Sequence, residues 1–188
     1  LIDPFCGSGT LLIEAGLLAT NTAPGLFRKR FGFQLWDGHN KEGFEHLKDR
    51  LRKEIRPLGK TRLIGNDLEA GRLQDVEDNA EIAGFSDNIQ LESGNATEFD
   101  FKPGWNACVV TNPPYGERIG DVRDLMPVYR AFGERLRDRG QGYEVAIFSG
   151  NTDLASQLSM KFLRSLPLKN GAIECEILQG VIPETSKD

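Results

Sequence analysis

The N-terminal segment constrains the fold most, because a short apolar stretch runs directly into a glycine-rich turn and then into a helical pattern. Leu1 to Asp3 are typical of a strand, Gly7 and Gly9 mark the turn, and residues 11–19 continue as an apolar helix. Glycine permits left-handed backbone angles and close approach of a ligand to the main chain. The free N–H groups that begin a helix suit an anionic group such as a carboxylate. This order of elements indicates a nucleotide-binding α/β sheet.

Two common classes of nucleotide-binding turn match this segment poorly. Leu12 stands where the third glycine of a dinucleotide fingerprint belongs, and no Gly-Lys-Ser/Thr sequence follows as in a phosphate-binding loop. Asp3 stands at the end of the strand, where its negative charge would repel a pyrophosphate and attract the α-ammonium group of S-adenosylmethionine. The turn therefore favours S-adenosylmethionine over a dinucleotide or a nucleoside triphosphate.

The rest of the chain alternates between strand and helix patterns. Strands are predicted over residues 1–3, 62–66, 88–92, 106–111 and 143–149, and helices over 8–20, 69–84 and 121–138. The last of these helices has the clearest period, with an apolar stripe that is expected to face the core. Such alternation predicts an α/β fold with a Rossmann-like, doubly wound and mainly parallel sheet.

The C-terminal region departs from this alternation. Apolar runs over 162–168 and 172–178 flank Lys169-Asn170-Gly171. Asn-Gly between apolar runs is the strongest short-range signal of a β-hairpin. The sheet is therefore expected to be mixed and seven-stranded, and to end in an antiparallel hairpin.

The tetrapeptide Asn112-Pro113-Pro114-Tyr115 follows the apolar run 107–110. Neither proline has an N–H for a sheet ladder, so the chain must leave the sheet here. The side-chain oxygen of Asn112 and the carbonyl of Pro113 are acceptors that can hold the exocyclic amine of a nucleobase and direct its lone pair at an electrophilic methyl carbon. Tyr115 offers a flat face for an unstacked base. An ordinary Asn-Pro turn is the alternative explanation of the tetrapeptide alone.

Two further polar positions follow predicted strands. Asp67 can accept the ribose hydroxyls of a nucleoside ligand, or it can cap the helical segment that begins at Glu69. The order of the motifs favours the ribose. Asn95 and Ala96 follow the 88–92 strand, where Asn95 can hydrogen-bond an adenine ring or serve as a turn residue.

Four motifs in chain order carry a resemblance to a known family. They are Asp3-Pro4-Phe5-Cys6-Gly7-Ser8-Gly9-Thr10, Gly65-Asn66-Asp67, Asn79-Ala80-Glu81-Ile82-Ala83-Gly84 and Thr111-Asn112-Pro113-Pro114-Tyr115-Gly116-Glu117-Arg118. Together they resemble the class I S-adenosylmethionine-dependent methyltransferases. The longer match from Asn112 to Arg118 resembles the bacterial THUMP-associated 23S rRNA guanine-N2 methyltransferases. Older descriptions of such chains as N6-adenine-specific DNA methylases rest on the shared Asn-Pro-Pro-Tyr.

The resemblance implies a reaction and a set of site residues. The implied reaction is methylation of the exocyclic N2 amine of a guanine in 23S rRNA, and the alternative is adenine-N6 methylation of DNA or RNA. The cofactor residues expected are Asp3, Pro4, Cys6, Gly7, Ser8, Gly9, Thr10, Asp67, Asn95 and Ala96, and the catalytic residues expected are Asn112, Pro113, Pro114 and Tyr115. Asn95 departs from the family pattern Gly-Asp-Ala, although an amide still donates and accepts.

The net charge of −5 has the wrong sign for a domain that holds RNA by itself. The resemblance implies a THUMP RNA-binding module on the N-terminal side of the same parent chain. Residues 1–188 start in mid-strand without an initiator methionine and end in the polar tail 183–188, so we expect a single catalytic methyltransferase domain excised from a longer chain.

Residues 21–60 are expected to form an insertion that mixes aromatic and basic residues. Such mixtures are typical of surfaces that bind single-stranded nucleic acid, and Arg28, Lys29 and Arg30 are the expected RNA contacts. The alternative is a hydrophobic flap packed over the sheet edge, with solvated basic residues. Phe44, Leu47, Leu51 and Ile55 predict an amphipathic helix inside it.

Other classes of site receive little support. The three cysteines lack C-x-x-C spacing and are expected to be reduced thiols, and His39 and His46 lie in no ligand or triad motif and are expected to be solvated. No metal is expected. No apolar run is long enough to cross a membrane. These features together predict a cytoplasmic protein with no membrane partner.

Overall fold

The computed structural model describes residues 1–116 and 121–184 of the 188-residue chain. The motif residues Glu117 and Arg118 and the tail after Glu184 lie outside the described residues. The strands are β1 Ile2–Asp3, β2 Leu63–Asp67, β3 Ile89–Ser93, β4 Cys108–Thr111, β5 Glu144–Ser149, β6 Arg164–Asn170 and β7 Ile173–Val181. The helices are α1 Thr10–Ala19, α2 Lys41–Lys53, α3 Ala70–Ala83, α4 Val122–Arg139 and α5 Thr152–Gln157, with short 3₁₀ turns η1 Pro24–Phe27, η2 Gly32–Leu35 and η3 Ala96–Glu98.

The strands form one mixed sheet in the order β3-β2-β1-β4-β5-β7-β6. The first five strands are parallel, and β7 runs antiparallel to both β5 and β6. The prediction of a doubly wound, seven-stranded sheet with an antiparallel end is therefore confirmed. Strand order reverses between β1 and β4, which creates a crevice at their carboxyl ends where open α/β sheets bind ligands.

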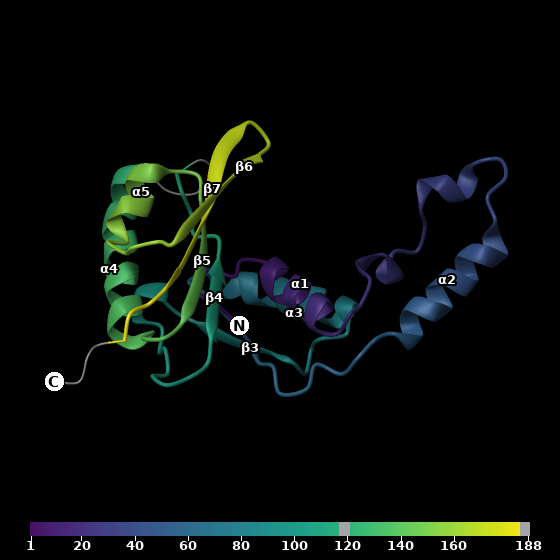
Figure 1. The fold of residues 1–188 in the computed structure, drawn as a ribbon, viewed down its shortest axis with the longest axis horizontal. Coiled ribbons are helices and arrows are strands. Elements are labelled where there is room, and N and C mark those ends of the chain that lie inside the picture. The colour runs from purple at the N-terminus through teal and green to yellow at the C-terminus, as the bar shows by residue number, and fades with distance from the viewer. Residues whose placement is uncertain (117–120, 185–188) are drawn as a thin grey trace.

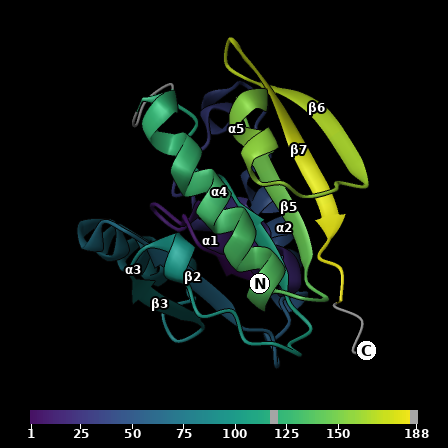
Figure 2. The ribbon, with the colours of Figure 1, turned by 90° about the vertical axis from the view of Figure 1, so that its left-hand side faces the viewer.

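Helices cover both faces of the sheet (Figure 1). α1 and α3 lie together on one face, and α4 and α5 lie on the other, which a view turned by 90° shows from the α4 side (Figure 2). No helix among the described residues has the length and apolar character that a membrane crossing requires.

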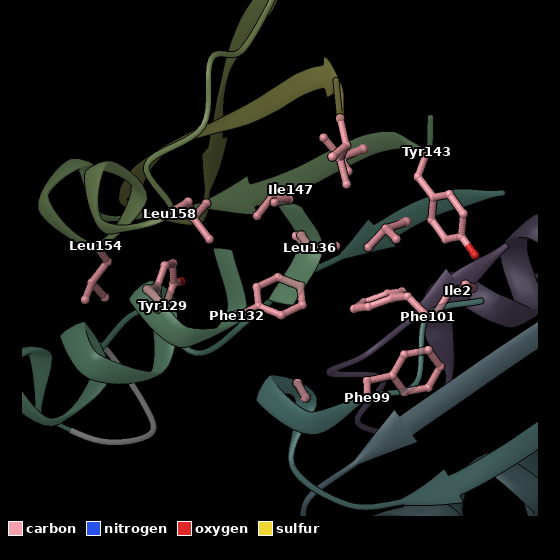
Figure 3. Packing of buried hydrophobic residues seen from close by; sticks show 14 of the residues in the cluster. Ile2, Phe99, Phe101, Tyr129, Phe132, Leu136, Tyr143, Ile147, Leu154 and Leu158 are labelled. Atoms are coloured by element: carbon pink, nitrogen blue, oxygen red, sulfur yellow. The ribbon is translucent and has the colours of Figure 1, made fainter. Parts of the chain in front are cut away.

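The main core lies between α4 and the sheet (Figure 3). Tyr129, Phe132 and Leu136 project from α4 onto the sheet, where Ile2 and Ile147 meet them, and all five side chains are at most 2% exposed. The helical stripe predicted over 121–138 is thus confirmed as core. Full burial of such side chains contributes roughly 1.5–3 kcal/mol each, and it holds β1 and β5 against one helix.

Two helices differ from the sequence-based expectation. α1 begins at Thr10 instead of residue 8, because Gly9 has a φ of +79°, which no right-handed helix accommodates. A Cβ at Gly9 would also lie 2.6 Å from Cγ1 of Val76. α5 was not expected, since six residues are too few to show a helical period.

The predicted C-terminal hairpin is confirmed, although its two turn residues are Gly171 and Ala172, and Lys169 and Asn170 belong to β6. Gly171 has a φ of +64°, a left-handed angle that glycine adopts without strain. Pairing of Ser149 with Glu176 places this hairpin directly beside the carboxyl end of β5.

The insertion projects away from the sheet (Figure 1). It packs around its own aromatic cluster, in which Phe31 and Phe33 stack at 5.3 Å between ring centroids and Phe44 meets both rings edge-on. The alternative of a flap over the sheet edge is therefore wrong, and Leu35 is 89% exposed. His39 is only partly solvated, because its ring lies 5.5 Å from that of Phe33. The amphipathic helix is confirmed as α2, although it ends before Ile55.

Candidate active site

Asp3 ends β1 at the point where strand order reverses, and its carboxyl group is buried at 1% exposure. Its Oδ1 accepts a hydrogen bond of 2.6 Å from the Thr111 hydroxyl at the end of β4, and one of 3.3 Å from the backbone N–H of Phe5. Burial raises the pKa of Asp3 to about 6, because the two donors only partly offset the lost hydration and the nearby negative charge of Asp67 raises the pKa further. Asp3 is thus a buried carboxyl group whose ionised form a cationic ligand would stabilise.

The glycine turn is tied to the neighbouring strand end. The backbone N–H of Gly7 donates a 2.8 Å hydrogen bond to Oδ2 of Asp67, while Oδ1 of the same carboxylate accepts the N–H of Glu69 at 3.0 Å. Asp67 therefore stabilises the approach to α3 and the glycine turn together. A Cβ at Gly7 would meet no atom within 4 Å, so the turn is open to a ligand at this residue.

Asn66 is a buried polar residue at this site, and its role was not predicted from the Gly65-Asn66-Asp67 motif that contains it. Its side chain is 3% exposed, and its Nδ2 donates to the carbonyls of Pro4 and Gly94, both at 3.0 Å. Its own carbonyl accepts the N–H of Cys6. One amide thus joins the loops that follow β1 and β3 to the end of β2. A polar residue inside an otherwise apolar strand pattern was the available signal.

The other motif residues near the glycine turn differ in how far they are buried. Cys6 is buried against the side chains of Leu12 and Val76, and burial raises the pKa of its thiol to about 12. It remains a protonated packing residue. The hydroxyl of Ser8 lies 3.5 Å from that of Thr10, and the Ser8 carbonyl accepts a hydrogen bond from Asn79.

Asn95 serves as a turn residue after β3, because its Oδ1 accepts the N–H of Thr97 at 3.0 Å and caps η3. Ala96 is 3% exposed and packs in the main core. The sequence reasoning missed Leu68, which directly follows Asp67 and is 71% exposed. An exposed leucine beside a candidate ribose acceptor supplies an apolar surface suited to a purine ring.

The Asn-Pro-Pro-Tyr segment leaves the sheet directly after β4, as predicted. Asn112 is exposed, whereas Pro113 is buried. The hydroxyl of Tyr129 donates a 3.0 Å hydrogen bond to the carbonyl of Pro114, so the loop is anchored to the core face of α4. Asn112 therefore stands beside Thr111, the hydrogen-bond partner of Asp3.

Tyr115 is held by the C-terminal part of the sheet. Its hydroxyl accepts a 3.0 Å hydrogen bond from Nδ2 of Asn170 at the hairpin turn. A Cβ at Gly150 would lie 2.8 Å from Cδ2 of the ring, so one edge of the tyrosine contacts the end of β5. The sequence offered no signal for this contact, because the hairpin lies 55 residues further along the chain.

The expected RNA contacts do not join this cluster. Arg28, Lys29 and Arg30 are exposed on the insertion, which extends away from the strand ends (Figure 1). The guanidinium of Arg28 lies 5.3 Å from the ring centroid of Phe31, so the basic segment is partly ordered by the aromatic cluster.

Sequence relatives match nearly the whole of this chain. A ribosomal RNA large subunit methyltransferase K/L from Methylococcus capsulatus is 44% identical over 189 residues, which cover 98% of this chain and 25% of that protein. The enzyme of the same name from Shewanella sediminis is 38% identical over 179 residues, with coverage of 93% and 25%. The chain therefore spans about a quarter of the length of these curated relatives.

Solved structures agree with the observed fold. SMU.472, described as a candidate methyltransferase and solved in complex with SAH, matches with a TM-score of 0.87 at 25% identity, covering 99% of this chain and 48% of that one. A protein from Listeria monocytogenes described as a predicted N6-adenine-specific DNA methylase matches with a TM-score of 0.84 at 27% identity, with coverage of 97% and 46%. The model of the RMKL-like methyltransferase domain, UPF0020, matches residues 1–179. The chain belongs to this family of RMKL-like methyltransferase domains.

Proposed function

We propose that this chain transfers a methyl group from S-adenosylmethionine to the exocyclic N2 amine of a guanine in 23S rRNA. The observation that carries the proposal is the hydrogen bond between Asp3 and Thr111, which brings the glycine-turn strand and the Asn-Pro-Pro-Tyr strand together at the switch point of the sheet. The names of the K/L relatives supply the substrate class.

The residues around the glycine turn fit S-adenosylmethionine. The open backbone at Gly7 leaves room for a ligand, and the buried carboxyl group of Asp3 suits an α-ammonium group. The carboxylate of Asp67, which accepts the N–H of Gly7, can also accept ribose hydroxyls, and the exposed Leu68 suits the adenine ring. When bound, the cofactor supplies an electrophilic methyl group on a sulfonium. Pro4, Cys6, Ser8, Gly9 and Thr10 shape the turn, and Asn95 and Ala96 shape the loop beyond β3.

The chain's own contribution to the reaction is to orient a weak nucleophile. The lone pair of a guanine N2 amine is delocalised into the ring, so fixed acceptors are needed to draw it out of plane. The Asn112 side-chain oxygen and the Pro113 carbonyl serve as these acceptors, and the bond from Tyr129 to Pro114 keeps the loop in place. After transfer the nitrogen is cationic and loses a proton readily, so no histidine base is required.

Tyr115 supports the target base on its ring. Contact with Gly150 and the hydrogen bond from Asn170 limit the positions that this ring can adopt. A base inside a duplex cannot reach the site, so the target is unpaired or flipped out.

RNA affinity beyond the target base comes from two sources. Arg28, Lys29 and Arg30 are exposed on the projecting insertion and contact phosphates there. A THUMP-type RNA-binding module N-terminal to this domain supplies the larger share, since the net charge of the chain is −5 and the relatives are about four times as long. Such an enzyme acts in the cytoplasm.

Adenine-N6 methylation is the second candidate, and the Listeria neighbour favours it through its description as a predicted N6-adenine-specific DNA methylase. The same two acceptors suit the N6 amine of adenine. Only the identity of the methylated nucleoside separates the two reactions.

The test uses the full-length protein, labelled S-adenosylmethionine and unmodified 23S rRNA, with nucleoside analysis of the product. We expect N2-methylguanosine in RNA. N6-methyladenosine would transfer the conclusion to the second candidate, and absence of any RNA product would overturn the proposal. Asn112→Ala should reduce kcat by about 100-fold or more with unchanged affinity for S-adenosylhomocysteine. The matched control is Asn106→Ala, an exposed asparagine in the loop that precedes β4.

A further inference from the structure

An open groove of about 670 Å³ lies between the carboxyl end of β5 and the β6–β7 hairpin. One wall is the connection 149–153, and the other consists of residues 167–169 and 174–176 of the hairpin. This volume falls within the range of roughly 300–1,000 Å³ that is usual for small-ligand sites. Neither the glycine turn nor the Asn-Pro-Pro-Tyr segment lines it.

The groove continues the target-base site along the sheet. Thr111 pairs with Ile147, so Asn112 leaves β4 beside the end of β5, where the groove begins. Gly150 lines the groove and also contacts the ring of Tyr115. β7 lies two strand spacings from β4, or roughly 10 Å. A nucleotide next to the target in the same RNA strand would therefore lie over the groove.

The charged side chains of the groove favour the N–H groups on the edge of a nucleobase over a phosphate group. Three carboxylates face one lysine, and the carboxylate of Glu174 lies 3.9 Å from Lys169 while that of Glu176 accepts the hydroxyl of Ser165. Asp153 is an exposed residue in the first turn of α5, and within the part of the chain that the structure describes its carboxylate has no hydrogen bond or ion pair. A free carboxylate repels phosphate and accepts N–H donors.

We propose that this groove holds an unpaired guanine that neighbours the methylated base, and that Asp153 recognises its Watson–Crick edge. The inference rests on the proposed RNA methyltransferase function. Guanine presents the N1–H and N2 amine side by side, which match the two oxygens of one carboxylate. Adenine and cytosine present an acceptor beside their amine on that edge, and uracil flanks its single N–H with carbonyl oxygens. Single-stranded RNA is commonly read through such edges.

The experiment first maps the modified base in 23S rRNA with the full-length wild-type protein. RNA transcripts are then compared in which the unpaired guanine next to that base is retained or replaced by adenine. For the wild-type protein we expect KM for RNA to rise about tenfold on replacement, with little change in kcat. Asp153→Asn should give nearly the same KM for both transcripts. Asp87→Asn, which removes a surface charge before the amino end of β3, is the matched control and should behave as the wild type.

Thermal melting of each variant checks that folding is intact. If Asp153→Asn distinguishes the guanine transcript from the adenine transcript as strongly as the wild type does, this inference is overturned and the proposed function stands. The same holds if no unpaired guanine adjoins the modified base. A wild-type protein that methylates no RNA would overturn the proposed function, and this inference with it.

Discussion

The hydroxyl of Thr111 donates a 2.6 Å hydrogen bond to the buried carboxyl group of Asp3, across two strands whose residues lie 108 positions apart in the chain. Both residues are 1% exposed. Because β1 and β4 are neighbours at the switch point, this bond connects the glycine turn to the segment that begins with Asn112. The candidate cofactor and target-base regions thus share one buried hydrogen bond.

Replacement of Thr111 by valine tests this connection. Valine leaves a buried acceptor without its donor, which should reduce the free energy of unfolding by about 1–3 kcal/mol at neutral pH. Loss of the donor should also raise the pKa of Asp3 further, so affinity for S-adenosylhomocysteine should begin to fall at a higher pH than in the wild type. Calorimetric titration between pH 5 and 8 measures this shift. Thr111→Ser keeps the hydroxyl and should resemble the wild type; equal shifts in both variants would contradict the assignment.

The pH dependence of stability provides a second prediction. The pKa of Asp3 is raised from 3.8 to about 6 by burial, so the folded protein binds this proton more tightly than the unfolded chain does. The contribution of Asp3 to the free energy of unfolding should therefore fall as pH rises from about 4 to about 6, by roughly 3 kcal/mol in total. Asp3→Asn should lack this component. Urea unfolding of the wild type and of Asp3→Asn between about pH 4 and pH 6 measures this contribution. The same pH dependence of the free energy of unfolding in both proteins would refute the prediction.

The affinity for a cationic ligand should change with pH in the opposite direction to the stability, through the same carboxyl group of Asp3. A cationic ligand group favours ionised Asp3, so affinity for S-adenosylhomocysteine should weaken as pH falls below about 6. Asp3→Asn should bind more weakly at pH 7.5 and show little further loss at pH 5. Retention of the wild-type pH profile in this variant would show that another group is responsible.

Gly7 and Gly9 should respond differently to alanine. Gly9→Ala combines a φ of +79° with a Cβ placed 2.6 Å from Val76, so we expect a loss of roughly 2–5 kcal/mol in the free energy of unfolding. Gly7→Ala meets no atom within 4 Å and should lose only about 1–2 kcal/mol through its φ of +53°. Its methyl group would instead stand in the open part of the turn and weaken S-adenosylhomocysteine binding. If Gly9→Ala weakened S-adenosylhomocysteine binding and Gly7→Ala chiefly lowered the free energy of unfolding, the result would argue against a ligand at Gly7.

Neutralisation of Arg28, Lys29 and Arg30 to glutamine should weaken RNA binding by the full-length protein. Three lost phosphate contacts should reduce the slope of log affinity against log salt by about 2 for single-stranded RNA. Affinity for S-adenosylhomocysteine should not change, because the insertion projects away from the strand ends. The control is the exposed basic triple Arg72, Lys102 and Arg164. Equal salt slopes for the two triple variants would count against a role for the insertion in RNA binding.

Much of the fold was predictable because its signals are local. Gly171 permits a tight turn through its left-handed backbone angle, Pro113 and Pro114 end a strand through missing N–H groups, and the stripe on α4 follows from helical period. The predicted start of a helix was less accurate where a single backbone angle decided it, as at Gly9 before α1. The short helix α5 carried too few residues for its period to be visible.

The sequence by itself determined the order of the elements and the motifs, since strand alternation, helical period, glycine and proline all act within a few residues. Only the tertiary structure decided that Thr111 donates a buried hydrogen bond to Asp3, that Asn66 joins two loops to β2, and that Asn170 holds Tyr115. These contacts depend on which strands become neighbours and on which loops meet at their ends. A buried polar group must find a partner somewhere in the fold, and local sequence does not specify which distant residue supplies it.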